Sequence, residues 1–193
     1  MSSDWLTSSG LHGPAFAEPE TPGPKLILVG AVELAAALSG LARAIGWRPY
    51  VVDPRERFAD PARFPGAEAV VAAWPGEAFD QIGGIDASTA VVLLTHDPVL
   101  DDPALEIALR SPAVFIGAMG SRRTQAGRRA RLAAAGLTGD ELGRLSGPVG
   151  LDIGARTALE TALSILSEIV AARHGRDGGR LAESKGRIHE VPA

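Results

Sequence analysis

A strand-to-helix stretch, IGAMGSRR, carries the residue types that most clearly suggest a binding site in this sequence. Gly117 and Gly120 permit unusual backbone angles, and Ser121 can cap the helix that follows. The first N–H groups of a helix are unpaired and carry a partial positive charge, so Arg122 could reach an anion held there. We therefore expect an anion site at this stretch. Farther along the same helix, three arginines are expected to form a solvated face: Arg128, Arg129 and Arg131.

A second polar stretch, THDPVLDD, follows a continuous apolar strand. Thr95 offers a hydroxyl, His96 an imidazole and Asp97 a carboxylate, and these groups could bind a ligand or a divalent cation. His96 could also act as a general acid or base, because an imidazole changes its charge near neutral pH. The spacing is not diagnostic of a metal site, and the alternative is that Asp97 and Asp101 only cap or brace turns.

A third polar stretch, SGPVGLDIGART, precedes the last long helix. Asp152 and Arg156 flank Gly154, and their polar side chains could bind a ligand. Alternatively, the stretch could be a tight turn with a purely structural role. Thr157 and Glu160 have the spacing of a capping box, which predicts that the helix begins here. The apolar stripe of this helix is expected at Leu159, Leu163, Leu166 and Val170.

The first strand-to-helix turn, in LILVGAVELAAAL, has half of a dinucleotide-binding motif. Gly30 ends the strand, and Asp53 follows at the tip of the next strand, where a carboxylate could bind a ribose hydroxyl. Val32 stands where a second glycine would let the backbone approach a pyrophosphate, and Glu33 adds a competing negative charge. At this turn we favour a βαβ unit that no longer binds nucleotide, with Glu33 complementing the helix dipole.

Short β-branched runs alternate with helical segments through the middle of the chain, as in a parallel sheet covered on both faces. This alternation predicts an α/β fold: a single Rossmann-like, doubly wound domain with a mostly parallel sheet of five or six strands and helices on both faces. Such sheets bind ligands outside the carboxyl ends of their strands, where all four stretches fall. The expected strands cover Lys25–Val29, 49–52, 67–72, 88–95 and 113–121.

The ends of the helices are marked by capping residues and glycines. Asp101 or Asp102 is expected to cap the middle helix, with Pro103 in its first turn, where the missing N–H does no harm. Gly46 should end the first helix and Gly136 the basic helix.

Composition and charge exclude several classes of function. The chain has 193 residues and a formal net charge of -4, which gives no general electrostatic reason to bind nucleic acid or an anionic membrane. It has no cysteine, which excludes disulfides, thiolate metal sites and a cysteine nucleophile. No apolar run is long enough to cross a bilayer and no secretory signal is visible, so a cytoplasmic location is expected.

Both ends of the sequence lack the periodicity of the middle. Residues 1–24 and 175–193 are expected to be tails, and residues 25–174 the domain. Four large apolar side chains of the first tail could dock on the domain, or the tail could be disordered or loosely packed: Trp5, Leu6, Leu11 and Phe16.

Together these stretches resemble the xanthine dehydrogenase accessory factor family (XdhC/CoxI), specifically its C-terminal Rossmann-like domain. The resemblance rests on the first turn with Asp53 and on RFPGAEAVV, THDPVLDD, FIGAMGSRR, AAAGLTGDEL and GPVGLDIGARTALETALSILSEIVAAR, which cover residues 25–173 nearly end to end and in order. The combination of T-H-D, G-x-x-G-S-R and G-L-D-I-G-A is specific, whereas each piece alone is weak.

The resemblance implies a maturation factor, not an enzyme, that serves molybdenum hydroxylases of the xanthine dehydrogenase or carbon monoxide dehydrogenase type. The expected ligand is molybdenum cofactor or a nucleotide form of it, which the factor holds, protects and helps to insert into the apoenzyme. Under this hypothesis Arg122 would hold phosphate, and Asp53 would hold a ribose hydroxyl if a nucleotide is present. His96 and Asp97 would orient the pterin or the oxygen ligands of the metal.

The sequence departs from the usual pattern of the family at several places. The first turn is usually G-A-G-H-V-A but here reads G-A-V-E-L-A, and the second histidine usual in T-H-D-H is Pro98. Ala158 stands where a proline commonly follows the threonine. The usual N-terminal domain has no counterpart, and without cysteine the chain cannot supply a thiolate to molybdenum. We therefore expect a separate partner subunit that resembles the missing domain.

Two other functions stay open at this point. Gly30 and Asp53 suggest an oxidoreductase that binds NAD(P), although Val32 and Glu33 argue against it. The same two departures suggest a ligand-free scaffold that docks on a partner protein. The client enzyme and the oligomeric state do not follow from these residues.

Overall fold

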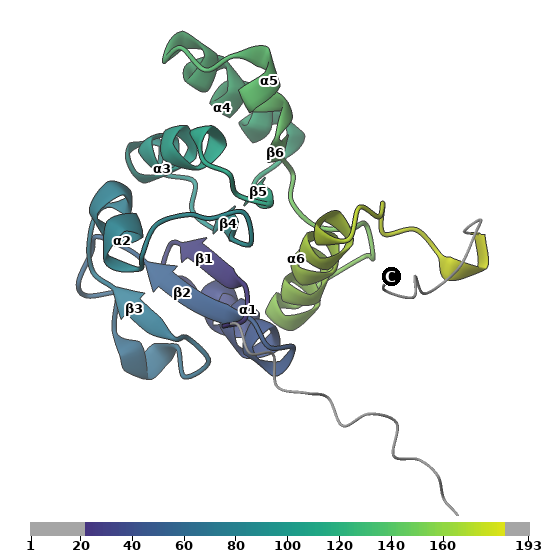
Figure 1. Ribbon diagram of the computed structural model, residues 1–193, viewed down its shortest axis with the longest axis horizontal. Helices are drawn as coiled ribbons and strands as arrows, with labels where there is room; N and C mark the ends of the chain where they lie inside the picture. Colours follow the sequence, from purple (N-terminus) through teal and green to yellow (C-terminus); the bar gives the residue numbers. More distant parts are fainter. Residues whose placement is uncertain (1–21, 184–193) are drawn as a thin grey trace, which may run out of the picture.

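The computed structural model describes residues 22–183, which form a parallel sheet with helices on both faces (Figure 1). The sheet has six strands in the order β3-β2-β1-β4-β5-β6, and every neighbouring pair is parallel. The strands are β1 (Lys25–Val29), β2 (Arg48–Val52), β3 (Ala69–Val71), β4 (Ala90–Leu93), β5 (Phe115–Ala118) and β6 (Leu145–Ser146). This order confirms the predicted doubly wound α/β fold.

The central strands owe their position to apolar runs without alternation. All residues of β1 and β4 are buried, because helices cover both faces of the sheet there. β1 pairs with β2 on one side and with β4 on the other, so the winding of the sheet reverses at β1. A crevice for a ligand is expected beside the carboxyl ends of these strands.

The helices divide between the two faces of the sheet. Two helices cover one face, α1 (Glu33–Ala44) and α6 (Ala158–Arg173). The other face is covered by α2 (Pro75–Gln81), α3 (Pro98–Arg110), α4 (Arg122–Ala134) and α5 (Gly139–Gly143). Two short 3-10 turns complete the elements of the described residues, η1 (Pro61–Arg63) and η2 (Leu181–Glu183). Across residues 22–183, no helix combines the length and the apolar character that a bilayer span requires.

Helix α3 begins earlier than the capping signals in the sequence predict. Asp97 caps it, because the side chain of Asp97 accepts a hydrogen bond from the backbone N–H of Val99 at 3.0 Å, and Pro98 occupies the first helical position. The prediction of Asp101 or Asp102 as the cap is therefore wrong, and Pro103 lies inside the helix. The sequence D-P occurs twice in this stretch, and the first copy starts the helix.

The predicted stripe of α6 is only partly buried. The capping box of Thr157 and Glu160 is confirmed, but Leu159 is 62% exposed and Leu163 is 50% exposed. The buried face of the helix instead carries Ala162, Ser164, Ile165, Leu166 and Ile169. Of the predicted stripe, Leu166 lies on this buried face, whereas Leu159 and Leu163 belong to a second apolar face that points away from the core.

This correction predicts a large difference between two substitutions in the same helix. Ile165→Ala should lower the free energy of unfolding by about 2–5 kcal/mol, because it opens a cavity at a fully buried position. Leu159→Ala, the matched control on the exposed face, should change it by less than about 0.5 kcal/mol. Urea unfolding followed by circular dichroism measures both values, and equal losses would contradict the assignment of the faces.

Candidate functional site

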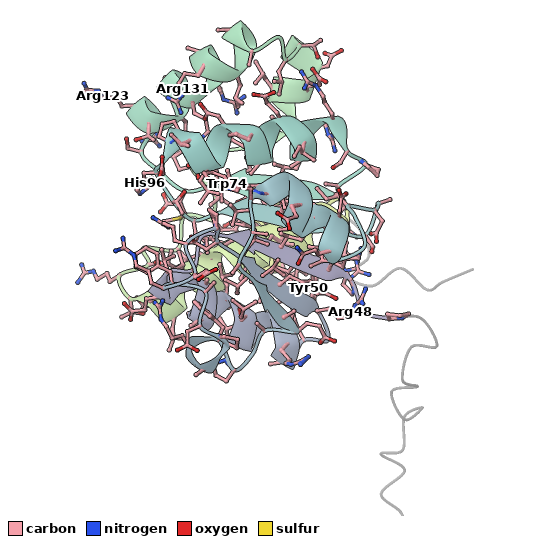
Figure 2. The ribbon with its side chains drawn as sticks, turned by 90° about the vertical axis from the view of Figure 1, so that its left-hand side faces the viewer. Arg48, Tyr50, Trp74, His96, Arg123 and Arg131 are labelled. Atoms are coloured by element: carbon pink, nitrogen blue, oxygen red, sulfur yellow. The ribbon has the colours of Figure 1, made fainter. Side chains whose placement is uncertain are left out.

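The polar stretches identified in the sequence all follow strands at the carboxyl edge of the sheet. Gly30 follows β1, Asp53 follows β2, Thr95 follows β4 and Gly120 follows β5. In Figure 2, His96 and Arg123 project at one edge of the molecule, whereas Arg48, which begins β2, lies at the opposite edge. The edge with His96 and Arg123 is therefore the one where a doubly wound fold binds ligands.

A hollow of about 680 Å³ lies at this edge, beside the start of α4. Seven residues from the start of α4 and from two loops line it: Gly120, Ser121, Arg122, Arg123, Pro148, Gly150 and Asp152. Four of them were predicted as site residues, and the structure brings Asp152 of the third stretch next to the glycine–serine–arginine turn. The hollow is therefore the place where two of the predicted stretches meet.

The start of α4 supplies the positive side of the hollow. Gly120 adopts a φ of 129°, and the Oγ atom of Ser121 accepts a hydrogen bond from the backbone N–H of Thr124 at 3.2 Å. Arg122 and Arg123 are exposed, and no carboxylate of residues 22–183 forms an ion pair with either of them. An anionic ligand would therefore meet two guanidinium groups and a helix N-terminus without displacing a protein carboxylate.

A buried ion pair lies close to the same loops. The guanidinium of Arg128 donates to the carboxylate of Asp101 at 3.0 Å, and both side chains are 1% exposed. The hydroxyl of Thr95 donates to the other oxygen of Asp101. Arg128 also donates to the backbone carbonyl of Met119 at 3.1 Å and to the side-chain oxygen of Gln125 at 2.8 Å. This network joins the loop after β4 to the loop after β5.

Gln125 extends the network to the backbone just before Gly120. Its amide nitrogen donates to the carbonyl of Ala118 at 2.9 Å and to that of Met119 at 3.1 Å. A Cβ atom on Gly147 would lie 2.5 Å from the side-chain oxygen of Gln125, so the loop after β6 packs on the same amide. Gln125 therefore fixes both loops that line the hollow.

The prediction of a solvated arginine face on α4 is wrong for two of its three members. Arg128 is buried in the network, and Arg129 donates to the backbone carbonyls of Leu142 and Leu145. Only Arg131 is exposed, where it pairs with Asp102 at 2.6 Å. Neighbouring elements supply acceptors that helical periodicity alone cannot reveal.

The turn after β1 is closed by contact with the loop after β4. Gly30 has a φ of +111°, and a Cβ atom there would lie 2.4 Å from the Cγ2 atom of Thr95. Val32 is the N-cap of α1 and makes no side-chain capping bond, while Glu33 is exposed in the first turn. Thr95 is thus a packing partner of this turn as well as a hydrogen-bond donor to the buried network.

Asp53 is fully buried, and its carboxylate is surrounded by donors. The backbone N–H of Ala31 donates to it at 3.0 Å, and Arg55 donates through its backbone N–H at 3.0 Å and through two guanidinium nitrogens at 2.8 Å each. Burial alone would raise the pKa of Asp53, but the hydrogen bonds from Arg55 and Ala31 outweigh it and lower the pKa below the ordinary value of 3.8. A ribose hydroxyl could bind Asp53 only by displacing Arg55.

The remaining predicted site residues lie at different places: one inside a strand, one exposed at the carboxyl edge, and two outside the lining of the hollow. Gly117 lies inside β5, where a Cβ atom would be 2.5 Å from the Cγ2 atom of Val149, so the glycine permits close packing there. His96 is exposed and open to a ligand. Gly154 and Arg156 do not line the hollow, and the backbone N–H of Arg156 donates to the Glu160 carboxylate as part of the cap of α6.

Sequence reasoning missed Arg55, Arg123, Pro148 and Gly150 as members of this edge. Arg123 follows Arg122 directly, and Arg55 follows Asp53 by two residues, so short-range spacing could have identified both. Pro148 and Gly150 carry no such signal, because their place beside α4 depends on how β6 pairs with β5. Among the described residues, no group of three or more His, Asp or Glu side chains could hold a metal ion.

The buried pair predicts a strong response to the loss of one partner. Arg128→Met should lower the free energy of unfolding by about 3–5 kcal/mol, because it leaves the carboxylate of Asp101 buried without its cation. The double variant Asp101→Leu, Arg128→Met should lose less than Arg128→Met alone, because no unpaired charge remains. As a control, Arg131→Ala in the exposed pair should cost less than about 1 kcal/mol. Chemical denaturation of all three variants tests this order. A free energy of unfolding of Arg128→Met equal to that of the wild type would refute it.

Asp53 predicts a stability effect that depends on pH. Asp53→Asn should lower the free energy of unfolding at pH 7 by about 1–2 kcal/mol, a reduced value because Arg55 is partly in water. The pKa of Asp53 is lower in the folded protein, so its contribution is present above the unfolded pKa of about 3.9 and is lost as the pH falls through the folded pKa. The difference between wild type and variant should therefore be constant from pH 7 to about pH 5 and shrink below about pH 4. Urea unfolding across this range measures it, and a constant difference down to pH 2 would be inconsistent with the assignment.

Three curated proteins are similar to this chain over most of its length. The molybdenum cofactor insertion chaperone PaoD of Escherichia coli (strain K12) is 31% identical over 152 residues, which is 79% of this chain and 41% of that protein. A probable xanthine dehydrogenase subunit from Bacillus subtilis (strain 168) is 31% identical over 175 residues, covering 86% and 50%. The uncharacterized protein YqeB of Escherichia coli (strain K12) is 29% identical over 156 residues, covering 81% and 28%.

A solved structure and a family model agree with these relatives. A xanthine dehydrogenase structure from Bacillus halodurans matches with a TM-score of 0.68 and 27% identity, over 85% of this chain and 46% of that chain. The chain thus spans half or less of the length of each of these relatives. The model of the XdhC Rossmann domain matches residues 26–169, which include all six strands of the sheet except Lys25. The match confirms the resemblance seen in the sequence: the chain belongs to the XdhC Rossmann domain family.

Proposed function

We propose that this chain is a maturation factor for molybdenum hydroxylases of the xanthine or carbon monoxide dehydrogenase type, and that it binds molybdenum cofactor for insertion into the apoenzyme. The observation that carries the proposal is the hollow at the start of α4, where Arg122 and Arg123 have no carboxylate partner within residues 22–183. The similarity to a molybdenum cofactor insertion chaperone supports the choice of ligand.

The hollow suits the anionic end of such a ligand. Molybdenum cofactor is an anionic pterin that carries phosphate, and a phosphate is stabilised by backbone N–H groups at a helix N-terminus and by arginine. The volume of about 680 Å³ is within the range of small-molecule sites. Asp152 lines the same hollow and offers an acceptor to N–H groups of a pterin ring.

The other half of the crevice is less suited to a nucleotide. The carboxylate of Asp53 already accepts from Ala31 and Arg55, and Val32 stands at the point where a pyrophosphate would approach α1. These contacts oppose the NAD(P) hypothesis. They also mean that a nucleotide form of the cofactor would have to displace Arg55 before its ribose reached Asp53.

The loop after β4 contributes one exposed imidazole to the proposed site. His96 lies at this edge of the sheet and can donate to or accept from the pterin. One carboxylate oxygen of Asp97 already accepts from the backbone N–H of Val99, so its role is first to start α3. His96 is therefore the better candidate of the two to orient the pterin.

The proposed partners follow from the same reasoning. The client would be a molybdenum hydroxylase apoenzyme, which receives the cofactor at the carboxyl edge of the sheet. A second partner would be a subunit that resembles the portion of the longer relatives outside the match. The chain should bind molybdenum cofactor by itself, without such a partner.

Arg122→Ala should weaken the binding of molybdenum cofactor by about 1.5–3 kcal/mol, or about tenfold to a hundredfold in Kd, because it removes a charge-assisted hydrogen bond. Anaerobic calorimetric titration measures the change. Arg131→Ala, which removes the same charge farther along α4, is the control and should leave Kd unchanged.

Two results would count against this proposal. Wild-type affinity in Arg122→Ala would remove Arg122 from the site. Absence of any binding to the wild-type chain, with NAD(H) titrated in parallel, would instead favour the scaffold that docks on a partner protein.

A further inference from the structure

An apolar groove of about 650 Å³ lies along α6, where the core residue Leu166 forms part of its lining, and the proposed function does not use it. Leu163 and Val170 of α6 form one wall, and Ile45, Leu151 and Leu181 contribute from other parts of the chain. Ile45 is 52% exposed, Leu163 is 50% exposed and Leu181 is 66% exposed. The groove thus exposes several large apolar side chains side by side.

Three residues of the stripe predicted from the periodicity of α6 line this groove: Leu163, Leu166 and Val170. Leu163 and Val170 have the helical spacing of a packing face, yet within residues 22–183 Leu163 is half exposed and Val170 is only partly buried. An occupant that covers this apolar surface would gain about 25 cal/mol of free energy for each Å² removed from water. Contiguous exposed apolar residues usually mark a contact surface.

The chain enters the described structure beside this groove. A Cβ atom on Gly23 would lie 2.0 Å from the backbone carbonyl oxygen of Gly46, and Arg48 donates to the carbonyl of Gly23 at 2.9 Å. Gly46 directly follows Ile45, which lines the groove. The residues before Pro22 therefore start from a point next to the groove wall.

The preceding residues have the length and composition to fill the groove. Residues 1–21 include four large apolar side chains, Trp5, Leu6, Leu11 and Phe16. An extended chain spans about 3.3 Å per residue, so the residues between Phe16 and Pro22 can bridge roughly 20 Å.

Charge also favours this segment over an arbitrary apolar partner. Residues 1–21 contain Asp4, Glu18 and Glu20 and no lysine or arginine. Near the groove, exposed Arg173 follows the lining residue Ala171 by two residues and its guanidinium lies 5.4 Å from the centre of the Trp47 ring, whereas Arg180, which precedes Leu181, already pairs with Glu183 at 3.2 Å. Arg173 has no carboxylate partner within residues 22–183, so an acidic apolar segment lying in the apolar groove could pair with it.

We propose that residues 1–21 dock in the groove between α6, Ile45 and Leu181 of the same chain, with Phe16 as the anchor nearest to the point of entry. This contact goes beyond the proposed function, because it lies on α6 and not at the hollow beside α4. It gives the apolar residues of the first tail a docking surface on the domain.

Because the chain has no cysteine, a disulfide between two introduced cysteines tests the contact cleanly. Ser167→Cys places a thiol in the groove, and Ala17→Cys places one beside Phe16. The matched control combines Ala17→Cys with Ala126→Cys, an exposed position on α4 at the other face of the sheet. The full-length variants are oxidised at low protein concentration without added cofactor and analysed by mass spectrometry.

We expect an intrachain disulfide at least tenfold more abundant in the Ser167 pair than in the Ala126 pair. Phe16→Ser should reduce it to the level of the control pair, and this change leaves every residue of the sheet and helices untouched. Equal yields in the two pairs, or a yield insensitive to Phe16→Ser, would overturn the proposal. A disulfide formed only between chains would do so as well and would assign the groove to a second copy. None of these results depends on whether the chain binds molybdenum cofactor.

Discussion

The ion pair between Asp101 and Arg128 is the interaction on which the carboxyl edge of the sheet depends. Two charges taken out of water are costly unless they are paired and hydrogen-bonded, and of this buried pair the Nε atom of Arg128 is left without a hydrogen-bond partner within residues 22–183. Here Thr95 donates to the acid and the carbonyl of Met119 accepts from the base, so the backbone of two loops takes part. Neither loop can shift far without leaving a buried charge unpaired, which keeps the hollow beside α4 in one shape.

The two halves of the crevice use charge in opposite ways. On the side of β1 and β2, the carboxylate of Asp53 is neutralised within the protein by Arg55, and the turn at Gly30 is packed against Thr95. On the side of β5 and β6, Arg122 and Arg123 line a hollow beside a helix N-terminus. A ligand with a negative group gains more on the second side, because there it replaces water and not a protein ion pair. This asymmetry favours an anionic pterin bound beside α4 over a dinucleotide bound across β1.

Sequence patterns predicted well those features that depend on near neighbours in the chain. The apolar runs of β1 and β4, the capping box at Thr157 and the serine cap of α4 are all present as expected. The start of α3 was missed because two D-P pairs compete, and local signals do not show that Asp101 is needed elsewhere. The short strand β6 was not located, since two residues carry too little periodicity to identify a strand.

By itself, the sequence determined the alternation of strands and helices and hence the doubly wound sheet, because strand and helix periods arise from contacts within a few residues. It also determined that glycines, Ser121 and Arg122 would stand at a strand-to-helix turn at the ligand-binding edge. Only the tertiary structure decided which arginines of α4 are buried, which apolar face of α6 meets the core and whether Asp53 is free for a ligand. Those outcomes depend on groups brought together from distant parts of the chain or on how a side chain is packed and paired in the folded protein. Asp101 pairs with Arg128 in the interior, while its neighbour Asp102 pairs with the half-exposed Arg131 at the surface, and only the packing of α3 against α4 separates the two cases.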